Sequence, residues 1–230
     1  MSRGTVPWRY RRQPEDVRPP GYPPWLSAPT RSRNHVRQHK RSRRRATAVN
    51  DAPIEIEPYN NEWPKLFELE ATSLSEVLRP WLVGAVEHIG STAVLGLAAK
   101  PVIDIMAPVS SLADAEPAIE ALSALSYCYY PYRADVMHWF CKPSPAHRTH
   151  HLHLVPPGSA LWVQRLAFRD ALRKSADLAA EYQALKRRLA NEHAHDREAY
   201  TEAKSPFIQS VLRSVGASAA LYLPVDRHTK

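Results

Sequence analysis

The apolar residues of this chain follow two different periods, and the change between them falls near Ser159. Before it, short runs such as KPVIDIMAPV and THHLHLVP carry β-branched or alternating apolar residues, as strands do. After it, residues 159–176, 176–194 and 196–215 repeat their apolar side chains at helical spacing. The order of the two patterns predicts an α/β or α+β fold, in which a mixed β-sheet core is joined to a helical C-terminal half.

The strand-forming part also contains helical periodicity at two places. Residues 64–78 read as a helix with Pro64 in its first turn, where proline is tolerated, and residues 112–125 read as a second helix. Strands are expected in the runs between them. The expected strands are 81–89, 100–109, 127–133, 137–143 and 149–156, of which the last three are predicted to pair antiparallel.

Charge divides the chain near residue 50. Residues 1–50 hold thirteen Lys and Arg against two acids, a net charge of +11, whereas the whole chain carries +8, which leaves −3 for residues 51–230. The first 50 residues are also proline-rich and nearly free of aliphatic side chains, so they cannot bury enough apolar surface to offset their ordering entropy. We therefore predict a disordered basic extension at 1–50, one folded domain at 51–216 and a short tail at 217–230.

The basic extension has two interpretations. The run from Arg41 to Arg45 is suited to weak contact with nucleic acid through counterion release, or it belongs to a solvated extension without a partner. No stretch of the chain approaches the apolar length of a membrane span. The two cysteines, Cys128 and Cys141, are too few for a disulfide framework or a four-cysteine zinc site. These features predict a cytoplasmic protein with no membrane partner.

A Gly-Ser-Thr turn ends one apolar run, and a lone acid lies inside the next. Gly90, Ser91 and Thr92 bring backbone N–H groups and hydroxyls to the start of a helical turn, where a phosphate would be stabilised. Asp104 follows Lys100 in an apolar strand, where a carboxylate is costly unless it is paired, protonated or bound to a metal. We predict phosphate contacts at the turn and Lys100, with Asp104 as a Mg²⁺ ligand for nucleotidyl transfer. The structural alternative has Ser91 as a helix cap and Asp104 as an acceptor of backbone hydrogen bonds.

The run RTHHLHLV places histidines on both faces of one strand. His151 and His153 project to one face, and His150 projects to the other. Together with Asp104 from a neighbouring strand, His151 and His153 would form a two-histidine, one-carboxylate metal set, which favours a transition metal over Mg²⁺. His88, beside the Gly-Ser-Thr turn, is a further candidate. A metal site, a phosphate or substrate contact and a structural polar face remain open alternatives, and we predict Asp104, His151 and His153 as catalytic and metal-binding residues.

Five motifs together resemble the GrpB family, whose members are similar in fold to the nucleotidyltransferase superfamily. The resemblance runs from about Ile54 to Val215 and implies a nucleotidyltransferase-like core with a helical C-terminal portion, but no known reaction. It favours Arg148, Arg169 and Lys204, which lie within the motifs, as phosphate-binding residues; a solvated helix face or an ion pair is the alternative for Arg169 and Lys204. The motifs are EHIGSTAVLGLAAKPVIDI, RTHHLHLV, FRDALR, EYQALKRRLA and DREAYTEAKSPFI.

The chain departs from the family pattern at two positions. Leu95 stands where the family usually has proline, and Met106 stands where active nucleotidyltransferases usually carry a second carboxylate. Some members of the family are joined to dephospho-CoA kinase, where a role in folding has been suggested. This chain lacks the Gly-x-x-x-x-Gly-Lys-Ser/Thr loop of such a kinase, so no kinase activity of its own is expected.

Two functional hypotheses follow from the sequence. The first is a nucleotidyltransferase-like protein that binds a nucleotide or another phosphorylated small molecule, uses a divalent metal (Mg²⁺ or a transition metal) and transfers a nucleotidyl or phosphoryl group. The second is a non-catalytic accessory domain of the type joined to dephospho-CoA kinase. Met106 favours the second hypothesis, whereas Gly90, Ser91, Asp104 and the two strand histidines favour the first.

Overall fold

The structure is a computed structural model that describes residues 53–217. The predicted extension at 1–50, its arginine run and nearly all of the predicted C-terminal tail therefore lie outside the described residues. The elements are α1 (Trp63–Val77), β1 (Glu87–Ile89), a 3₁₀ turn η2 (Ser91–Ala93), β2 (Ile103–Pro108), α2 (Ala118–Ala121), η3 (Leu122–Leu125), β3 (Cys128–Tyr130), β4 (His138–Pro143), β5 (Arg148–Val155), α3 (Ala160–Lys174), α4 (Ala176–Glu192), α5 (Arg197–Ala203) and α6 (Ser205–Ser214).

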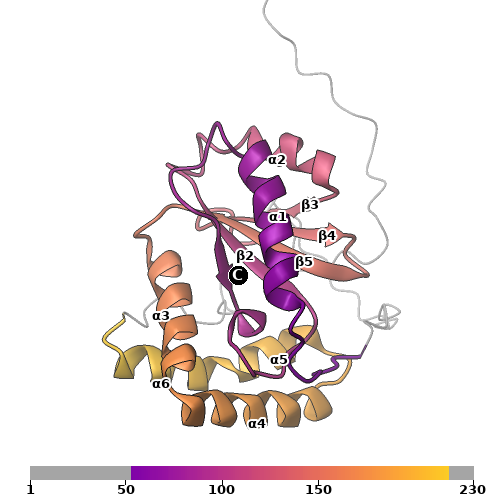
Figure 1. The fold of residues 1–230 in the computed structure, drawn as a ribbon, viewed down its shortest axis with the longest axis vertical. Helices are drawn as coiled ribbons and strands as arrows, with labels where there is room; N and C mark the ends of the chain where they lie inside the picture. The colour runs from indigo at the N-terminus through magenta and orange to yellow at the C-terminus, as the bar shows by residue number, and fades with distance from the viewer. Residues whose placement is uncertain (1–52, 218–230) are drawn as a thin grey trace, which may run out of the picture. The chain divides into compact units, whose positions relative to one another are not determined.

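One five-stranded sheet forms the centre of the domain, in the order β1-β2-β5-β4-β3 (Figure 1). The β1–β2, β5–β4 and β4–β3 pairs are antiparallel, and β2 and β5 are parallel. The chain therefore leaves β2, builds α2, β3 and β4, and returns as β5 beside β2. This arrangement confirms the predicted mixed sheet and the helical C-terminal half.

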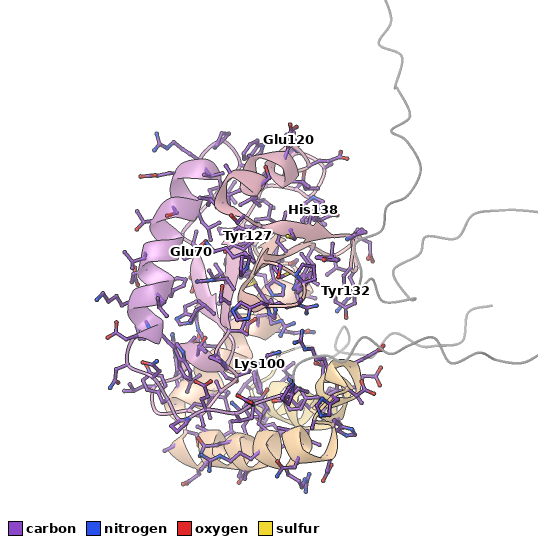
Figure 2. All side chains as sticks on the ribbon, turned by 90° about the vertical axis from the view of Figure 1, so that its right-hand side faces the viewer. Glu70, Lys100, Glu120, Tyr127, Tyr132 and His138 are labelled. Atoms are coloured by element: carbon purple, nitrogen blue, oxygen red, sulfur yellow. The ribbon has the colours of Figure 1, made fainter. Side chains whose placement is uncertain are left out.

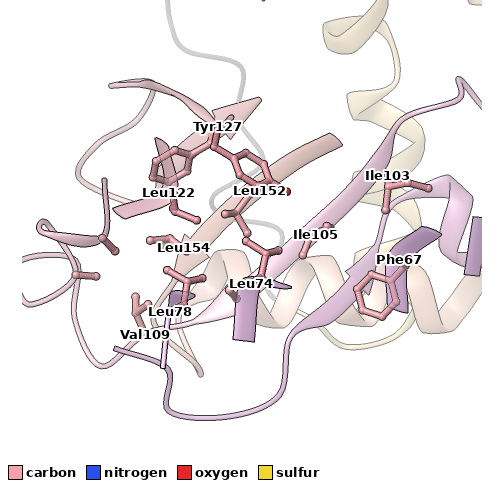
Figure 3. Close-up of a cluster of buried hydrophobic side chains, with 14 of the residues drawn as sticks. Phe67, Leu74, Leu78, Ile103, Ile105, Val109, Leu122, Tyr127, Leu152 and Leu154 are labelled. Atoms are coloured by element: carbon pink, nitrogen blue, oxygen red, sulfur yellow. The ribbon is translucent and has the colours of Figure 1, made fainter. Parts of the chain in front are cut away.

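The helix α1 covers one face of the sheet and buries the main core (Figures 1 and 3). Phe67 and Leu74 of α1, with Leu78 directly after the helix, pack on Ile105 of β2 and Leu152 of β5, all of them at most 8% exposed. Burying a large aliphatic or aromatic side chain contributes about 1.5 to 3 kcal/mol. This core therefore fixes which residues of β2 and β5 face α1, and the alternate residues must face the other side.

The opposite face of the sheet is covered by the C-terminal helices. Ile89, Met106 and Val155 pack against Leu161 of α3, and a separate cluster joins Leu172 to the other helices. Figure 1 shows α3 to α6 gathered at one end of the sheet, with α4 crossing below it in this view. The described helices do not include one that is both long and apolar enough to cross a membrane.

Several elements are shorter than the sequence predicted. The expected strand 81–89 is a strand only over Glu87–Ile89, because Leu82 makes an isolated bridge to Val109 and no ladder. The expected helix 112–125 keeps only α2 and η3, since α2 begins after Pro117. The expected helix 196–215 ends at Ala203 and restarts as α6 with a proline in its first turn, where the ring blocks continuation of the preceding helix.

Candidate functional site

Two strands align the predicted catalytic residues on one face of the sheet. In the parallel β2–β5 pair, Asp104 lies opposite His151 and Met106 lies opposite His153. Residues in register on neighbouring strands share a face, so these four side chains lie on the face covered by α3. His150 lies on the α1 face instead. The core on the α1 side thus determines the orientation of the candidate site.

Asp104 and His151 form a hydrogen-bonded pair. The His151 Nδ1 atom lies 2.9 Å from Asp104 Oδ1, and the two side chains are 19% and 32% exposed. Burial raises the pKa of Asp104, but the hydrogen bond and charge of His151, with further contributions from His153 and Arg165, outweigh burial and lower the pKa to about 2. The carboxylate is therefore ionised. Of the three states expected for an aspartate in an apolar strand, which were paired, protonated or metal-bound, the structure shows the paired one.

The Gly90 turn lies directly against Asp104. A Cβ atom at Gly90 would meet Asp104 Oδ2 at 2.4 Å and Asp104 Cβ at 2.9 Å. Gly90 has φ 72° and ψ −170°, a combination available almost only to glycine. The turn and the carboxylate, which are separated in sequence, thus form one unit, and a side chain at residue 90 would displace Asp104.

Four basic side chains lie near the Gly90 turn and Asp104: Lys100, Arg165, Lys186 and Lys204. Burial lowers the pKa of Lys204 to about 8; Asp104 raises it, while Arg165 and Lys100 lower it further. Burial likewise lowers the pKa of Lys186 to about 7, and repulsion by Lys204 contributes. The Lys186 side chain is 2% exposed, and its ammonium donates a hydrogen bond to the Ala98 carbonyl. Burial is the main cause of both lowered pKa values, and repulsion between neighbouring cations adds to it.

Helix α3 holds the backbone on both sides of the Gly90 turn. Arg169 donates to the His88 carbonyl at 3.0 Å and pairs with Glu87 at 2.7 Å. Arg173 donates to the Ala93 carbonyl at 2.9 Å. Arg169, predicted as a phosphate contact, therefore has protein partners that tie α3 to the turn.

Helix α4 holds the loop after the turn in the same way. Gln183 Oε1 accepts a hydrogen bond from the Ala98 N–H group at 2.8 Å, and Lys186 donates to the carbonyl of the same residue. The sequence analysis predicted neither of these contacts. The residues lie three apart, on one helix face, but no local pattern indicates that this face meets a backbone segment.

Three other residues singled out by the sequence, Thr92, His88 and Arg148, also have protein contacts. The Thr92 hydroxyl is buried between His88 Nε2, at 3.0 Å, and the Val102 carbonyl. His88 stacks on Phe67 on the α1 face, and burial lowers the pKa of its imidazole to about 4. Arg148 lies over the Trp139 ring, 5.4 Å from its centroid.

The predicted metal set does not converge. Asp104 and His151 bind each other, and His153 Nδ1 lies 3.2 Å from Met137 Sδ. Within residues 53–217, no group of three His, Cys, Asp or Glu side chains has the spacing to hold a metal ion. These residues do not fit a metal centre in this arrangement.

A second polar cluster, which the sequence did not predict, lies on the α1 face. Lys142 Nζ contacts both carboxylate oxygens of Glu70 at 2.6 Å, and the ammonium lies 5.1 Å from the centroid of the Tyr127 ring. Figure 2 shows Glu70 on α1 near Tyr127, with Lys100 further toward the C-terminal helices. The pair is mostly buried and joins α1 to β4, so we assign it a structural role.

Comparison with known proteins relates most of the domain to one family. The family described as GrpB protein matches residues 53–214. A UPF0157 protein of Pseudomonas aeruginosa is 36% identical over 168 residues, which cover 71% of this chain and 68% of that protein. The crystal structure of conserved protein GrpB from Enterococcus faecalis is similar with a TM-score of 0.65 at 31% identity, covering 70% of this chain and 96% of that one.

A further relative is an enzyme. A dephospho-CoA kinase of Mycolicibacterium paratuberculosis is 29% identical over 193 residues, which cover 70% of this chain. The match spans only 46% of the kinase. The likeness therefore concerns part of that enzyme.

Proposed function

This chain belongs to the GrpB protein family, and we propose that it binds a phosphorylated small molecule, with a nucleotide as the favoured class, beside the Asp104–His151 pair. The single observation that carries this proposal is a group of basic side chains close enough to Asp104 for the charges to act on one another: Lys100, Arg165, Lys186 and Lys204. Lys186 and Lys204 both have lowered pKa values, and Arg165 and Lys100 act on Lys204. A bound anion would offset the repulsion between these cations.

A phosphate fits this charge pattern better than a carboxylate does. A phosphate group carries up to two negative charges and several acceptor oxygens, so it can accept hydrogen bonds from more than one cation at once. The His151 Nε2 atom is buried, and no described protein atom forms a hydrogen bond with it. This nitrogen is a further contact for the ligand, such as a hydroxyl next to the phosphate.

Group transfer by a two-metal mechanism is less well supported than binding. Met106 is fully buried and packs in the apolar cluster with Ile89 and Leu161. A second metal-binding carboxylate would stand at this position in the nucleotidyltransferases that the fold resembles. We therefore propose ligand binding as the primary function, with nucleotidyl or phosphoryl transfer as the reaction class if the ligand is turned over, and with a cytoplasmic location.

The match to a dephospho-CoA kinase favours one second candidate, an accessory domain that assists the folding of such a kinase. Its test is the refolding yield of a dephospho-CoA kinase with and without this chain. An equal yield would remove this candidate. The two functions are compatible, because a bound phosphorylated ligand would stabilise the accessory domain itself.

Thermal unfolding with ATP, pyrophosphate and inorganic phosphate, each with and without Mg²⁺ or Zn²⁺, tests the binding proposal. A ligand at about 100 times its Kd stabilises the folded state by about 2.7 kcal/mol, which raises Tm by roughly 5 to 10 °C in a domain of this size. The shift should disappear in Lys204→Met. It should persist in Lys65→Met, because the Lys65 side chain is 73% exposed on α1.

Proton uptake gives an independent readout of the same binding. A bound phosphate should raise the lowered pKa values of Lys186 and Lys204, so binding at pH 8 should take up protons from the buffer. Calorimetric enthalpies measured in buffers of different ionisation enthalpy would reveal this uptake. The absence of a shift with every millimolar phosphorylated probe, or a shift that survives Lys204→Met, would contradict the proposal.

A further inference from the structure

The two cysteines face each other across neighbouring strands. Cys128 of β3 is the direct partner of Cys141 of β4 in the antiparallel ladder. The next two pairs of this ladder have touching rings: the centroids of Tyr129 and Phe140 are 5.2 Å apart, and those of Tyr130 and Trp139 are 5.7 Å apart. Direct partners in this ladder are therefore side-chain neighbours, and the two thiols share one face of the sheet.

The backbone separation suits a disulfide after a small movement. Directly opposed residues in an antiparallel pair have Cβ atoms about 4.5 to 5.5 Å apart, and a disulfide needs about 3.5 to 4.5 Å. The strand β3 has three residues and lies at the edge of the sheet, so it can approach β4 without disturbing another strand. The Cys128 thiol now contacts the Pro143 carbonyl at 3.7 Å and would have to turn from it.

We propose that Cys128 and Cys141 are a reversible modification site, at which a peroxide or a disulfide of low molecular weight converts the two thiols into one intramolecular disulfide. With hydrogen peroxide, the Cys128 sulfur attacks one oxygen, the O–O bond breaks, and water leaves a sulfenic acid behind. The Cys141 thiol then displaces the hydroxyl group, forms the S–S bond and releases a second water. Two electrons pass from the thiols to the peroxide, and both thiol protons end in water. With a disulfide of low molecular weight, the Cys128 sulfur forms a mixed disulfide and expels one thiol; the Cys141 sulfur then displaces the second thiol, and these two thiols carry away the electrons and protons.

The environments of the two cysteines assign the order of these steps. Cys128 is partly exposed, whereas Cys141 is fully buried. Burial raises the pKa of the Cys141 thiol to about 11, although Arg148 lowers it, so this thiol stays protonated at neutral pH. Cys128 therefore meets the oxidant first, and Cys141 resolves the sulfenic acid before further oxidation.

The position of the pair links the modification to the candidate site. Cys141 is the direct partner of His151, and His151 is the direct partner of Asp104, so one row of side chains runs across four strands from Cys128 to Asp104. A disulfide would fix the edge of the sheet at one end of this row. The inference does not depend on the proposed ligand, because the bond can be measured without one.

The test uses the full chain, fully reduced and then freed of reductant. It is treated with equimolar hydrogen peroxide or, separately, with oxidised glutathione, after which free thiols are counted under denaturing conditions and the intact mass is measured. We expect both thiols to be lost together, a mass decrease of about 2 Da from the two hydrogens removed, a monomer on a non-reducing gel, and full reversal by dithiothreitol. Tm should rise by a few degrees, since the bond shortens the free loop of the unfolded chain.

Single-thiol variants provide the matched controls. Cys141→Ala should gain oxygen or one glutathione at Cys128, whereas Cys128→Ser, which keeps only the buried Cys141, should stay largely unmodified. Neither variant should lose about 2 Da or gain thermal stability after oxidation. Circular dichroism of the untreated variants checks that both fold. Survival of both thiols, a stable glutathione adduct on Cys128 alone, or a covalent dimer in the unchanged chain would overturn the proposal.

Discussion

Replacing Gly90 by alanine should destabilise the domain by about 3 kcal/mol through two additive costs. The backbone at Gly90, with φ 72° and ψ −170°, costs a non-glycine residue about 1 to 3 kcal/mol. The new Cβ atom would also stand 2.4 Å from Asp104 Oδ2, so the carboxylate must move from His151. A hydrogen bond to a charged group contributes about 1.5 to 3 kcal/mol, and we take the lower end because Asp104 is 32% exposed.

Two other glycines serve as controls that separate the backbone cost of Gly90→Ala from the cost of the clash with Asp104. Gly96 and Gly158 have φ 77° and φ 76°, and a Cβ atom at either would meet nothing within 4 Å. Alanine at these positions should cost about 1 kcal/mol from the left-handed backbone alone. Urea unfolding followed by circular dichroism measures all three variants, with the stability change taken from the midpoint at constant slope.

A double variant tests the clash between a Cβ atom at residue 90 and Asp104 in a second way. The cost of Gly90→Ala should shrink in an Asp104→Ala background, because two of the three closest atoms are then absent and only the Cβ atom at 2.9 Å remains. If Gly90→Ala costs no more than Gly96→Ala or Gly158→Ala, the contact between the turn and the carboxylate does not constrain the fold, and the reasoning is wrong.

Two further predictions concern the pH dependence of stability. Burial lowers the pKa of His88 to about 4, so the unfolded chain binds more protons than the folded chain between pH 6.5 and 4. The free energy of unfolding, measured with urea, should therefore fall by about 3 kcal/mol from pH 7 to pH 4 relative to His88→Gln. Burial lowers the pKa of Lys186 to about 7, so the folded chain loses this destabilising charge as the pH rises above 7. The free energy of unfolding of the unchanged chain, relative to Lys186→Met, should therefore increase by about 2 kcal/mol between pH 7 and pH 9. A constant difference between the two proteins would contradict the lowered pKa.

The sequence predicted the parts of the candidate site that depend on strand periodicity. Alternation along RTHHLHLV separates His151 from His150, and an aspartate in an apolar strand indicates a partner. The actual partner depends on the register of two parallel strands whose paired residues are 47 apart in sequence, Asp104 and His151. No local pattern encodes that register, because the buried core on the α1 face selects it.

The helical half illustrates the opposite limit. Its periodicity predicted helices but not their partners. A phosphate contact and an ion pair were both expected for Arg169, and the structure pairs it with Glu87 and the His88 carbonyl. The break between α5 and α6 was missed although the proline at residue 206 indicates it, because the apolar spacing continues through it. Long-range packing of a helix face on a backbone segment leaves no pattern in either segment alone.

The hydrogen bonds from α3 and α4 to the Gly90 turn also set the order in which the site can be assembled. Arg169, Arg173, Gln183 and Lys186 reach backbone groups that precede them by 80 to 88 residues. During synthesis, the turn leaves the ribosome long before the side chains that secure it, and contacts of such separation form late. A nascent chain that ends before α3 would therefore have β2 and β5 but no secured turn. Ligand affinity should arise only once α4 and Lys204, which directly follows α5, have been released.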